Sequence, residues 1–507
     1  MFDNLTNFLI NRKITQGANE SLTNRQFMQN ELEQFLASPE RAMMMIGERY
    51  YDGKHDILKK RRTMIDPNGK KERELFNLPN NKIVDNQYRK MVNQKKNYLM
   101  GKPITISTEN KAYSKLLDEI FTKRIMRLIK NMYKDALNGG KGWLFFGYDA
   151  EGELKIRKFK PYEILPFWSD SEHSVLDAAL RVYDVSVYDG KDEKKIQRVE
   201  IYTQDGIDYF ERAEQGQLIA VEPYHQSYFT VSVDDKEQGF NWSKIPLIAF
   251  KYNDTEMPLI RAVKSLQDGI NQIESTFQDN MQEDPRNTLL VLINYDGQNL
   301  EEFKSNIAQY GVIKIRGGEG GGDVKSLQIE VNAENYKSIL KVLKDALIEN
   351  AMGYDAKDDR LNGNPNEMNI QSMYSDIDLD ANETESEFQA GFEELMWFIN
   401  CHLFNTGKGD FSKEEVTFTF NRSTMVNKGE IINEIKNSTG IISKRTQLEN
   451  HPFVNDVDEE LKRIEEEKKA EIDMYGFGNM LNPNNDDDDD DIDDKGNKKK
   501  KEDAEDE

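Results

Sequence analysis

The sequence predicts an α+β fold, because helical and strand patterns occupy separate regions of the chain. Between 142 and 252, short β-branched and aromatic runs alternate with turn residues, which is typical of strands. Two helical stretches, 260–283 and 334–352, bracket a small αβ segment that would project from the rest of the fold. The other patterns typical of helices lie at about 24–65, 80–100, 111–138 and 367–404.

In the N-terminal region, Gly53 is a candidate helix stop within the pattern at 24–65. A polar and basic loop follows from Lys59 to Lys71. A helix is then expected over 80–100, because its apolar residues recur at helical spacing. Beyond it the sequence predicts a stop at Gly101–Pro103, a short strand at 104–107 and the helix at about 111–138.

The bracketed segment has its own order of elements. Pro258 opens the first bracketing helix, and Asp284-Pro285 ends it. Asn299 caps a short helix that ends at Tyr310 and carries Glu301 and Glu302 in its first turn, where they complement the helix dipole. Strands are predicted at 289–293, 312–315 and 327–331, the last two flanking the glycine-rich run Gly317–Gly322.

The 507 residues are enough for about two to four domains. The net charge is −24, of which −8 lies in residues 485–507, with 13 acids against 5 lysines. We expect this tail to be disordered. The acidic balance argues against a protein that coats DNA through a basic surface, but not against one through which DNA slides.

The single cysteine, Cys401, cannot form an internal disulfide, which fits synthesis in a reducing compartment. Its apolar neighbours predict a buried small hydrophobic residue. No run of 18 apolar residues suggests a membrane span, and Met1–Asn4 lacks the layout of a signal peptide.

Motifs for chemistry are weak in this sequence. Gly317–Gly322 lacks the lysine and Ser/Thr of a phosphate loop, which indicates a hairpin. Gly139–Gly142 is followed by Trp143 where a phosphate loop needs Ser or Thr, which indicates a turn. No cofactor or metal is predicted, because the histidines have no metal-ligand spacing. They are His55, His173, His225, His402 and His451.

Basic residues on the second bracketing helix suggest a binding role. Lys337, Lys341 and Lys344 fall at i, i+4 and i+7, on one helical face. In a monomer they would form a solvated edge. In a ring they would become bands of positive charge around a pore, able to touch DNA phosphates weakly and repeatedly.

An ordered set of motifs lies between residues 45 and 470. They are Tyr50–Gly53, Asn81–Asn86, Tyr98–Ile104, Ile245–Leu247, Leu266–Asn271, Ile442–Thr446, His451-Pro452 and Glu459–Glu467. In this order the set resembles portal proteins of tailed bacteriophages of Gram-positive hosts. A departure from the family pattern is Gly269, which puts the straightness of the first bracketing helix in question.

The resemblance implies a portal-type subunit, with a wing, a two-helix stem, a small αβ clip and a helical crown, that assembles as a dodecameric ring. The wing would comprise 1–257, helical and then strand-rich, together with a long helix and strand in 369–425. The remaining parts would be the stem helices 258–283 and 334–352, the clip 284–333, the tunnel loop 353–368, the crown 426–475 and the acidic tail 476–507.

The function implied is a channel at one capsid vertex for DNA packaging and ejection, in the virion after assembly in the host cytoplasm, with no catalysis of its own. The partners implied are further copies of the chain, double-stranded DNA, the terminase large subunit, a head–tail adaptor, and the major capsid and scaffolding proteins. DNA contacts are expected at Lys337, Lys341, Lys344, Lys357, Arg360, Asn362 and Asn364. Docking residues are expected at Asn299, Glu301, Glu302, Arg316, Gly317, Gly318, Glu319 and Gly320.

Two alternatives remain from the sequence. Another minor head protein of a phage would fit the acidic, helix-rich ends but not the bracket of helices. A Mg²⁺-dependent nuclease would need carboxylates to hold the metal. The candidates for that role are Asp358, Asp359, Asp376, Asp378 and Asp380.

Overall fold

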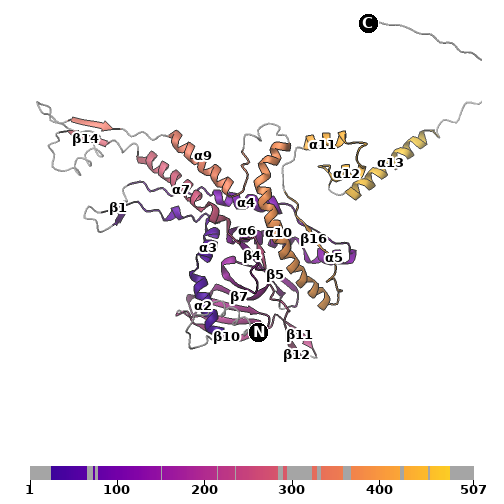
Figure 1. Cartoon of the computed structure of the whole chain (residues 1–507), viewed down its shortest axis with the longest axis horizontal. Coiled ribbons are helices and arrows are strands. Elements are labelled where there is room, and N and C mark those ends of the chain that lie inside the picture. Colours follow the sequence, from indigo (N-terminus) through magenta and orange to yellow (C-terminus); the bar gives the residue numbers. More distant parts are fainter. Residues whose placement is uncertain are drawn as a thin grey trace, which may run out of the picture. The chain divides into compact units, whose positions relative to one another are not determined.

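The computed structural model of all 507 residues contains both helices and strands, as predicted, and most of the strands lie together between residues 141 and 251 (Figure 1). The fold divides into one unit of residues 1–363 and 368–425, and a second unit of residues 364–367 and 426–507. The structure describes residues 24–65, 72–74, 78–149, 151–213, 215–233, 236–283, 289–293, 323–327, 333–357, 367–422, 428–454 and 457–479.

The predicted N-terminal helix is two helices, α2 (Asn24–Ala37) and α3 (Pro39–Tyr51). Ser38 separates them, since its Oγ accepts a hydrogen bond from the N–H of Arg41 at 3.1 Å and Pro39 opens the second helix. Gly53 follows the end of α3 with a φ of 81°, which confirms the helix stop. The prediction of helix as far as residue 65 was therefore wrong, and η1 (Asp56–Lys59) and β1 (Thr63–Ile65) occupy that end, with β1 paired to β2 (Glu72–Glu74).

The helix predicted over 80–100 is shorter, because α4 spans Gln87–Met100 and Asn86 is its N-cap. The helix predicted over 111–138 is also two helices, α5 (Lys111–Ile120) and α6 (Lys123–Gly139). Thr122 separates these two by accepting a hydrogen bond from the N–H of Ile125 at 3.4 Å. The sequence pattern missed both breaks because each cap lies inside a continuous amphipathic stretch.

A three-stranded antiparallel sheet lies at the centre of the first unit, with the order β13 (Leu247–Lys251), β4 (Lys141–Tyr148), β5 (Leu154–Phe159). In β4 only Tyr148 is not fully buried. The short helix η2 (Pro161–Glu163) then leads into the second sheet.

The second sheet is a five-stranded antiparallel meander, and α2 packs against its apolar side. A separate hairpin of β11 (Phe229–Val233) and β12 (Lys236–Phe240) follows it. The strands of the meander, in spatial order, are β10 (Leu218–Gln226), β9 (Gly206–Arg212), β8 (Asp192–Thr203), β7 (Leu176–Asp189) and β6 (Ile164–Trp168).

The long helix α10 (Glu367–Asn405) confirms the helix predicted at about 367–404 and forms much of the main core. Phe388 is fully buried, with its ring 5.2 Å from that of Phe250 on β13. Gly391 allows this close approach, since a Cβ there would lie 2.6 Å from the Phe250 ring. After α10, β16 (Thr417–Thr419) pairs with β3 (Thr105–Ser107).

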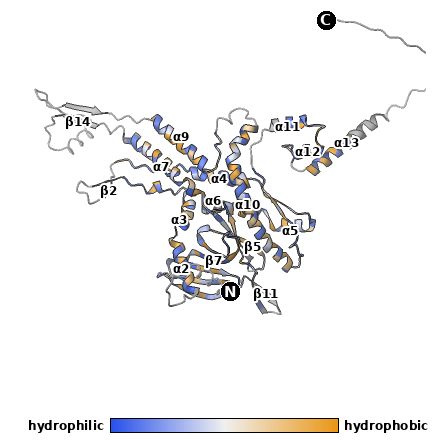
Figure 2. Cartoon of the chain, viewed as in Figure 1, coloured by the Kyte–Doolittle hydropathy of each residue, from blue (hydrophilic) through white to orange (hydrophobic). Residues whose placement is uncertain are grey.

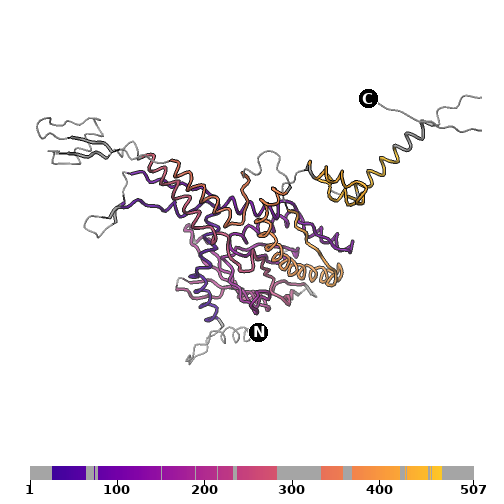
Figure 3. The backbone as a smooth tube through the Cα atoms, turned by 45° about the horizontal axis from the view of Figure 1, so that its top comes forward, coloured from indigo at the N-terminus to yellow at the C-terminus, as the bar shows by residue number. Residues whose placement is uncertain are grey.

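The two bracketing helices are α7 (Leu259–Glu283) and α9 (Ala333–Asn350), and they lie side by side (Figures 1 and 3). Both mix hydrophilic and hydrophobic residues along their length (Figure 2). Gly269 does not interrupt α7, and a Cβ there would lie 3.5 Å from Leu343 of α9. The ring centroids of Phe277 and Tyr336 are 4.8 Å apart. We call α7 and α9 the helix pair.

Between the two helices of the pair, β14 (Leu289–Ile293) matches the predicted strand and pairs with β15 (Asp323–Leu327). The strand predicted at 327–331 overlaps β15 only at Leu327, and its other residues lie outside the described part of the chain, as do the helix at 299–310 and the strand at 312–315. The second unit contains α11 (Lys428–Asn437), α12 (Lys444–Glu449) and α13 (Val457–Asn479). Among the described residues, none of the helices has the length and hydropathy of a membrane span.

Candidate functional site

The helix pair is fixed to the first unit by a line of polar side chains on α7. Gln267, Asn271, Ser275 and Asp279 lie four residues apart, and their exposed fractions are 0–4%. Four-residue spacing places side chains on one face of a helix. Polar residues buried in such a row need hydrogen-bond partners, and the partners are on an extended segment.

The extended segment, residues 81–86, and the first turn of α4 after it run antiparallel to α7 and bond to it through their backbone N–H groups. Four helical residues rise about 6 Å, close to the roughly 6.6 Å spanned by two residues of an extended chain. The spacing of the side chains on α7 therefore matches the spacing of every second residue in the extended segment. As a result, roughly every second backbone N–H of the segment donates to the next polar side chain along α7. The bonds are Asn81 N–H to Asp279 Oδ1 (2.6 Å), Ile83 N–H to Ser275 Oγ (2.9 Å), Asp85 N–H to Asn271 Oδ1 (3.0 Å) and Tyr88 N–H to Gln267 Oε1 (2.8 Å). We call this arrangement the polar ladder.

His55 extends the polar ladder through a hydrogen bond to Asn271. Its Nδ1 accepts a hydrogen bond from Asn271 Nδ2 at 2.7 Å, and its Nε2–H donates to the Tyr50 carbonyl at 3.0 Å. The side chain is buried and stacks on the Tyr50 ring, with centroids 4.4 Å apart. Burial lowers the pKa of His55, and the two bonds together require the neutral imidazole.

The three lysines predicted on one face of α9 have different surroundings. Lys344 Nζ lies 2.6 Å from Asp85 Oδ2 and 3.3 Å from Glu274 Oε1, so it ties α9 to the polar ladder and to α7. Burial opposes its charge, but these carboxylates outweigh burial and raise the pKa of Lys344. Lys337 and Lys341 are exposed and have no ion-pair partner in the described part of the chain.

The segment after α9 is held by α4. Gln94 forms two hydrogen bonds with the backbone of Tyr354, donating to its carbonyl at 2.7 Å and accepting from its N–H at 3.1 Å. The Tyr354 ring also lies 4.6 Å from that of Tyr374 on α10. Lys357, a predicted DNA contact, is exposed three residues beyond this anchor.

The other residues expected to contact DNA or docking partners lie outside the described residues. They are Arg360, Asn362 and Asn364, and then Asn299, Glu301, Glu302, Arg316, Gly317, Gly318, Glu319 and Gly320. Their roles stay predictions.

The acidic residues of the nuclease alternative do not converge where they are described. Asp378 accepts a hydrogen bond from the Tyr98 hydroxyl and pairs with Arg422 at 3.0 Å. Asp380 instead pairs with buried Lys95 at 2.7 Å and accepts from the Tyr252 hydroxyl at 2.5 Å. Asp376 is exposed, and Asp358 and Asp359 lie outside the described residues. Within the described part of the chain, no group of His, Cys, Asp and Glu has the geometry of a metal site.

The turn predicted at Gly139–Gly142 is confirmed. Gly140 ends α6 with a φ of 83°, and a Cβ there would collide with the Glu256 carbonyl. Lys141 is buried and forms an ion pair with the Glu256 carboxylate. The lysine is therefore occupied inside the fold and does not face a phosphate pocket.

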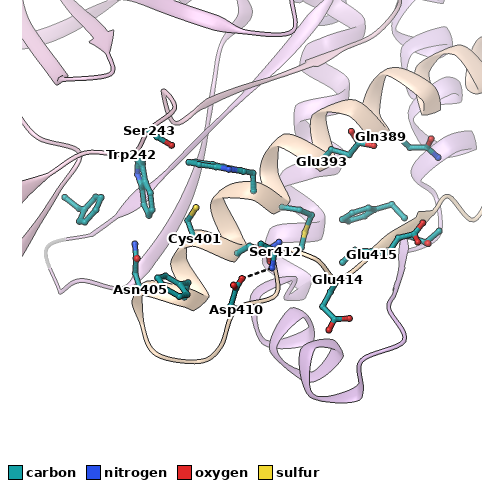
Figure 4. Close-up of a pocket in the computed structure, with 18 of the residues that line it drawn as sticks. Trp242, Ser243, Gln389, Glu393, Cys401, Asn405, Asp410, Ser412, Glu414 and Glu415 are labelled. Carbon is teal, nitrogen blue, oxygen red and sulfur yellow. Dashed lines mark hydrogen bonds between the residues drawn. The ribbon is translucent and has the colours of Figure 1, made fainter. Parts of the chain in front are cut away.

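Cys401 lines a groove of about 800 Å³ beside α10, which Figure 4 shows. The groove is lined by aromatic side chains, including Trp242 and Trp397, and acidic side chains, including Glu393 and Asp410. Cys401 packs against the main core but is only half-buried, so the predicted burial is partial, because the residue borders a groove. Burial raises its pKa, which keeps the thiol protonated.

Comparison with known proteins places these features in a family. The family model "Phage portal protein, SPP1 Gp6-like" matches residues 40–474. A portal protein of Bacillus phage SPP1 is 31% identical over 436 residues, which cover 85% of each chain. A portal protein of Clostridium phage phiCD119 is 26% identical over 450 residues, covering 85% of this chain and 94% of that protein.

Among solved structures, a chain in the neck of a native gene transfer agent particle, computed with C12 symmetry, aligns with a TM-score of 0.38 at 11% identity. That alignment covers 71% of this chain and 88% of the other. The family model spans the polar ladder, the helix pair and α10, and it extends into α13 of the second unit. The chain therefore belongs to the SPP1 Gp6-like family of phage portal proteins.

Proposed function

We propose that copies of this chain form a dodecameric ring at one capsid vertex, and that viral DNA passes through the ring during packaging and ejection. In this assembly α7 and α9 form the stem that lines the channel. The polar ladder supports this role, because its hydrogen bonds to backbone N–H groups resist sliding of the stem against the rest of the subunit. A channel wall under repeated load needs such a rigid base.

The observation that carries the proposal is that the lysines of α9 differ in whether their charge is paired within the chain. Lys344 is neutralised within the subunit by Asp85 and Glu274. Lys337 and Lys341 are exposed and unpaired in the described structure, so their charge is available to DNA phosphates. With a net charge of −24 per chain, the ring repels DNA overall, and two lysines per subunit provide brief contacts without strong retention.

The ring docks other proteins and performs no catalysis of its own. Residues 284–333 form the clip, which binds the terminase large subunit during packaging and a head–tail adaptor afterwards. The tunnel loop 353–368, including Lys357, meets DNA in the channel, and residues 426–475 form the crown. The major capsid and scaffolding proteins contact the wing while the ring seeds procapsid assembly in the host cytoplasm.

The test is a packaging assay with Lys337→Glu and Lys341→Glu, using Lys115→Glu on α5 as the matched control. Lys115 is also exposed but lies outside the helix pair. We expect all three variants to form rings. The two α9 variants should change the packaged DNA length or its retention, and the control should behave as the wild type. Normal packaging in both α9 variants would contradict this role for the lysines.

A further inference from the structure

Four cations gather around Tyr51, although the chain as a whole is acidic. The Arg89 guanidinium on α4 lies 5.3 Å from the centre of the Tyr51 ring, and Lys134 Nζ on α6 lies 5.0 Å from it. Lys96 is on α4, and Lys130 lies one turn before Lys134 on the same face of α6. Both are half-buried. Burial lowers the pKa of Lys96, and the charges of Lys130, Lys134 and Arg89 lower it further. We call these four residues the cation cluster.

The cation cluster lacks a full set of countercharges within the described residues. Arg89, Lys96 and Lys130 have no ion-pair partner there. Lys134 lies 3.6 Å from Asp135 Oδ1, but that carboxylate also pairs with Lys158 and, at 3.8 Å, with Lys160. A cluster that repels itself and is held by the fold has a cost in stability, and such costs are typical of binding sites.

Asn93 adds an amide hydrogen-bond donor to the cation cluster. Its Oδ1 accepts from the Tyr51 hydroxyl at 3.1 Å and from Lys96 Nζ at 3.2 Å. Because the amide oxygen already accepts two hydrogen bonds, the NH₂ group is the part of the Asn93 side chain that can donate to a ligand. Guanidinium, ammonium and amide donors together match an oxyanion, and the number of cations favours one with more than a single negative charge.

We propose that Arg89, Lys96, Lys130 and Lys134, with Asn93, bind a phosphate-type oxyanion. The phosphoryl oxygens belong either to a small phosphate compound or to the DNA backbone, which present the same chemistry to the site. A carboxylate-rich protein segment offers one charge per group and fits the convergence of four cations less well. The site lies on α4 and α6 and uses none of the lysines of α9, so it does not depend on the proposed channel contacts.

The test uses the full chain with tripolyphosphate as the small probe and a short DNA duplex as the second, both at physiological salt. Binding of each probe is measured by titration calorimetry in the wild type and in a double variant, Lys96→Gln with Lys130→Gln. The matched control is Lys115→Gln with Lys123→Gln, which removes the same charge from exposed positions outside the cluster. If the double variant does not fold, the single variant Arg89→Gln replaces it in the binding measurement, because Arg89 is exposed.

We expect the cluster variants to weaken tripolyphosphate binding about tenfold or more, and the control to change it less than about twofold. Without ligand, the double variant should melt at the same temperature as the wild type or higher, since repulsion is removed. Displacement of tripolyphosphate by the duplex would assign the site to the DNA backbone, and failure to displace it would assign the site to a small phosphate.

Three results would overturn the proposal. The first is the absence of saturable binding of either probe to the wild type. The second is an equal loss of binding in the cluster variants and the control. The third is unchanged phosphate binding accompanied by loss of ring assembly in the cluster variants, which would make the cluster a contact between subunits. Normal packaging in the α9 variants would leave this site unaffected.

Discussion

The carboxylate of Asp279 accepts two hydrogen bonds from Asn81, one from the backbone N–H at 2.6 Å and one from the side-chain amide at 2.7 Å. Asp279 lies near the outer end of α7, and Lys60 forms an ion pair with its other oxygen at 2.9 Å. The contact closes one end of the polar ladder. The position of the helix pair against the rest of the first unit therefore depends on a few identifiable side chains.

Replacing Asp279 should loosen this end of the polar ladder. Asp279→Ala leaves the Asn81 N–H and Lys60 without their acceptor, which should lower the free energy of unfolding by about 3 kcal/mol. Chemical denaturation of the purified protein measures the change. Gln272→Ala is the control, because Gln272 is exposed on the same helix and should change stability by less than about 0.5 kcal/mol. Equal losses in the two variants would argue against the ladder as a stabilising device.

His55 should make the helix pair sensitive to mild acid. Burial lowers its pKa in the folded state, so the unfolded chain, with a pKa of about 6.5, takes up the proton first. The stabilisation is complete above about pH 6.5 and is lost as the pH falls toward the folded pKa. His55→Gln preserves an acceptor and a donor without titrating, so its melting temperature should fall less between pH 7.5 and 5.5 than that of the wild type. Parallel curves for the two proteins would refute this assignment.

Lys344 and Lys341 should differ in what their removal changes. Lys344→Met removes the ion pairs with Asp85 and Glu274, and should lower stability by about 1 kcal/mol, given the partial exposure of the group. Lys341→Met removes an exposed, unpaired charge and should leave stability within about 0.5 kcal/mol of the wild type. Thermal melts of both variants in the same buffer compare them. A larger loss for Lys341→Met would reverse the assignment.

Gln94 should control the order of the chain just after α9. In Gln94→Ala the Tyr354 N–H loses its acceptor, so its amide hydrogen should exchange with solvent faster, by about tenfold for one lost hydrogen bond. Hydrogen-exchange mass spectrometry on a peptide containing Tyr354 measures this. Asn97→Ala, at an exposed position on the same helix, should leave the exchange unchanged. Slow exchange in Gln94→Ala would show that other contacts hold the segment.

Helix existence was predictable from sequence more readily than helix ends. The apolar stripe of α7 and the length of α10 could be predicted, because both depend on a local period. Residues 81–86 have a helical pattern yet are extended, because α7 supplies acceptors for their N–H groups from almost 200 positions away. The spacing of Gln267, Asn271, Ser275 and Asp279 was a visible signal of a buried polar face, but its partner segment was not.

For the candidate site, as for the fold, local spacing could be predicted from the sequence but tertiary contacts could not. The shared face of Lys337, Lys341 and Lys344 follows from helical spacing alone. That Lys344 is neutralised by Asp85 depends on a tertiary contact between distant segments, which spacing does not contain. Cys401 shows the same limit, since its apolar neighbours predict burial while the groove beside α10 leaves it partly exposed.

The most direct measurement is electron microscopy of the purified full chain. We predict closed rings of about twelve subunits with a central hole, consistent with cyclic symmetry, and α7 and α9 of every subunit lining that hole. A monodisperse monomer at micromolar concentration, or a ring in which Lys337 and Lys341 face away from the hole, would contradict the account.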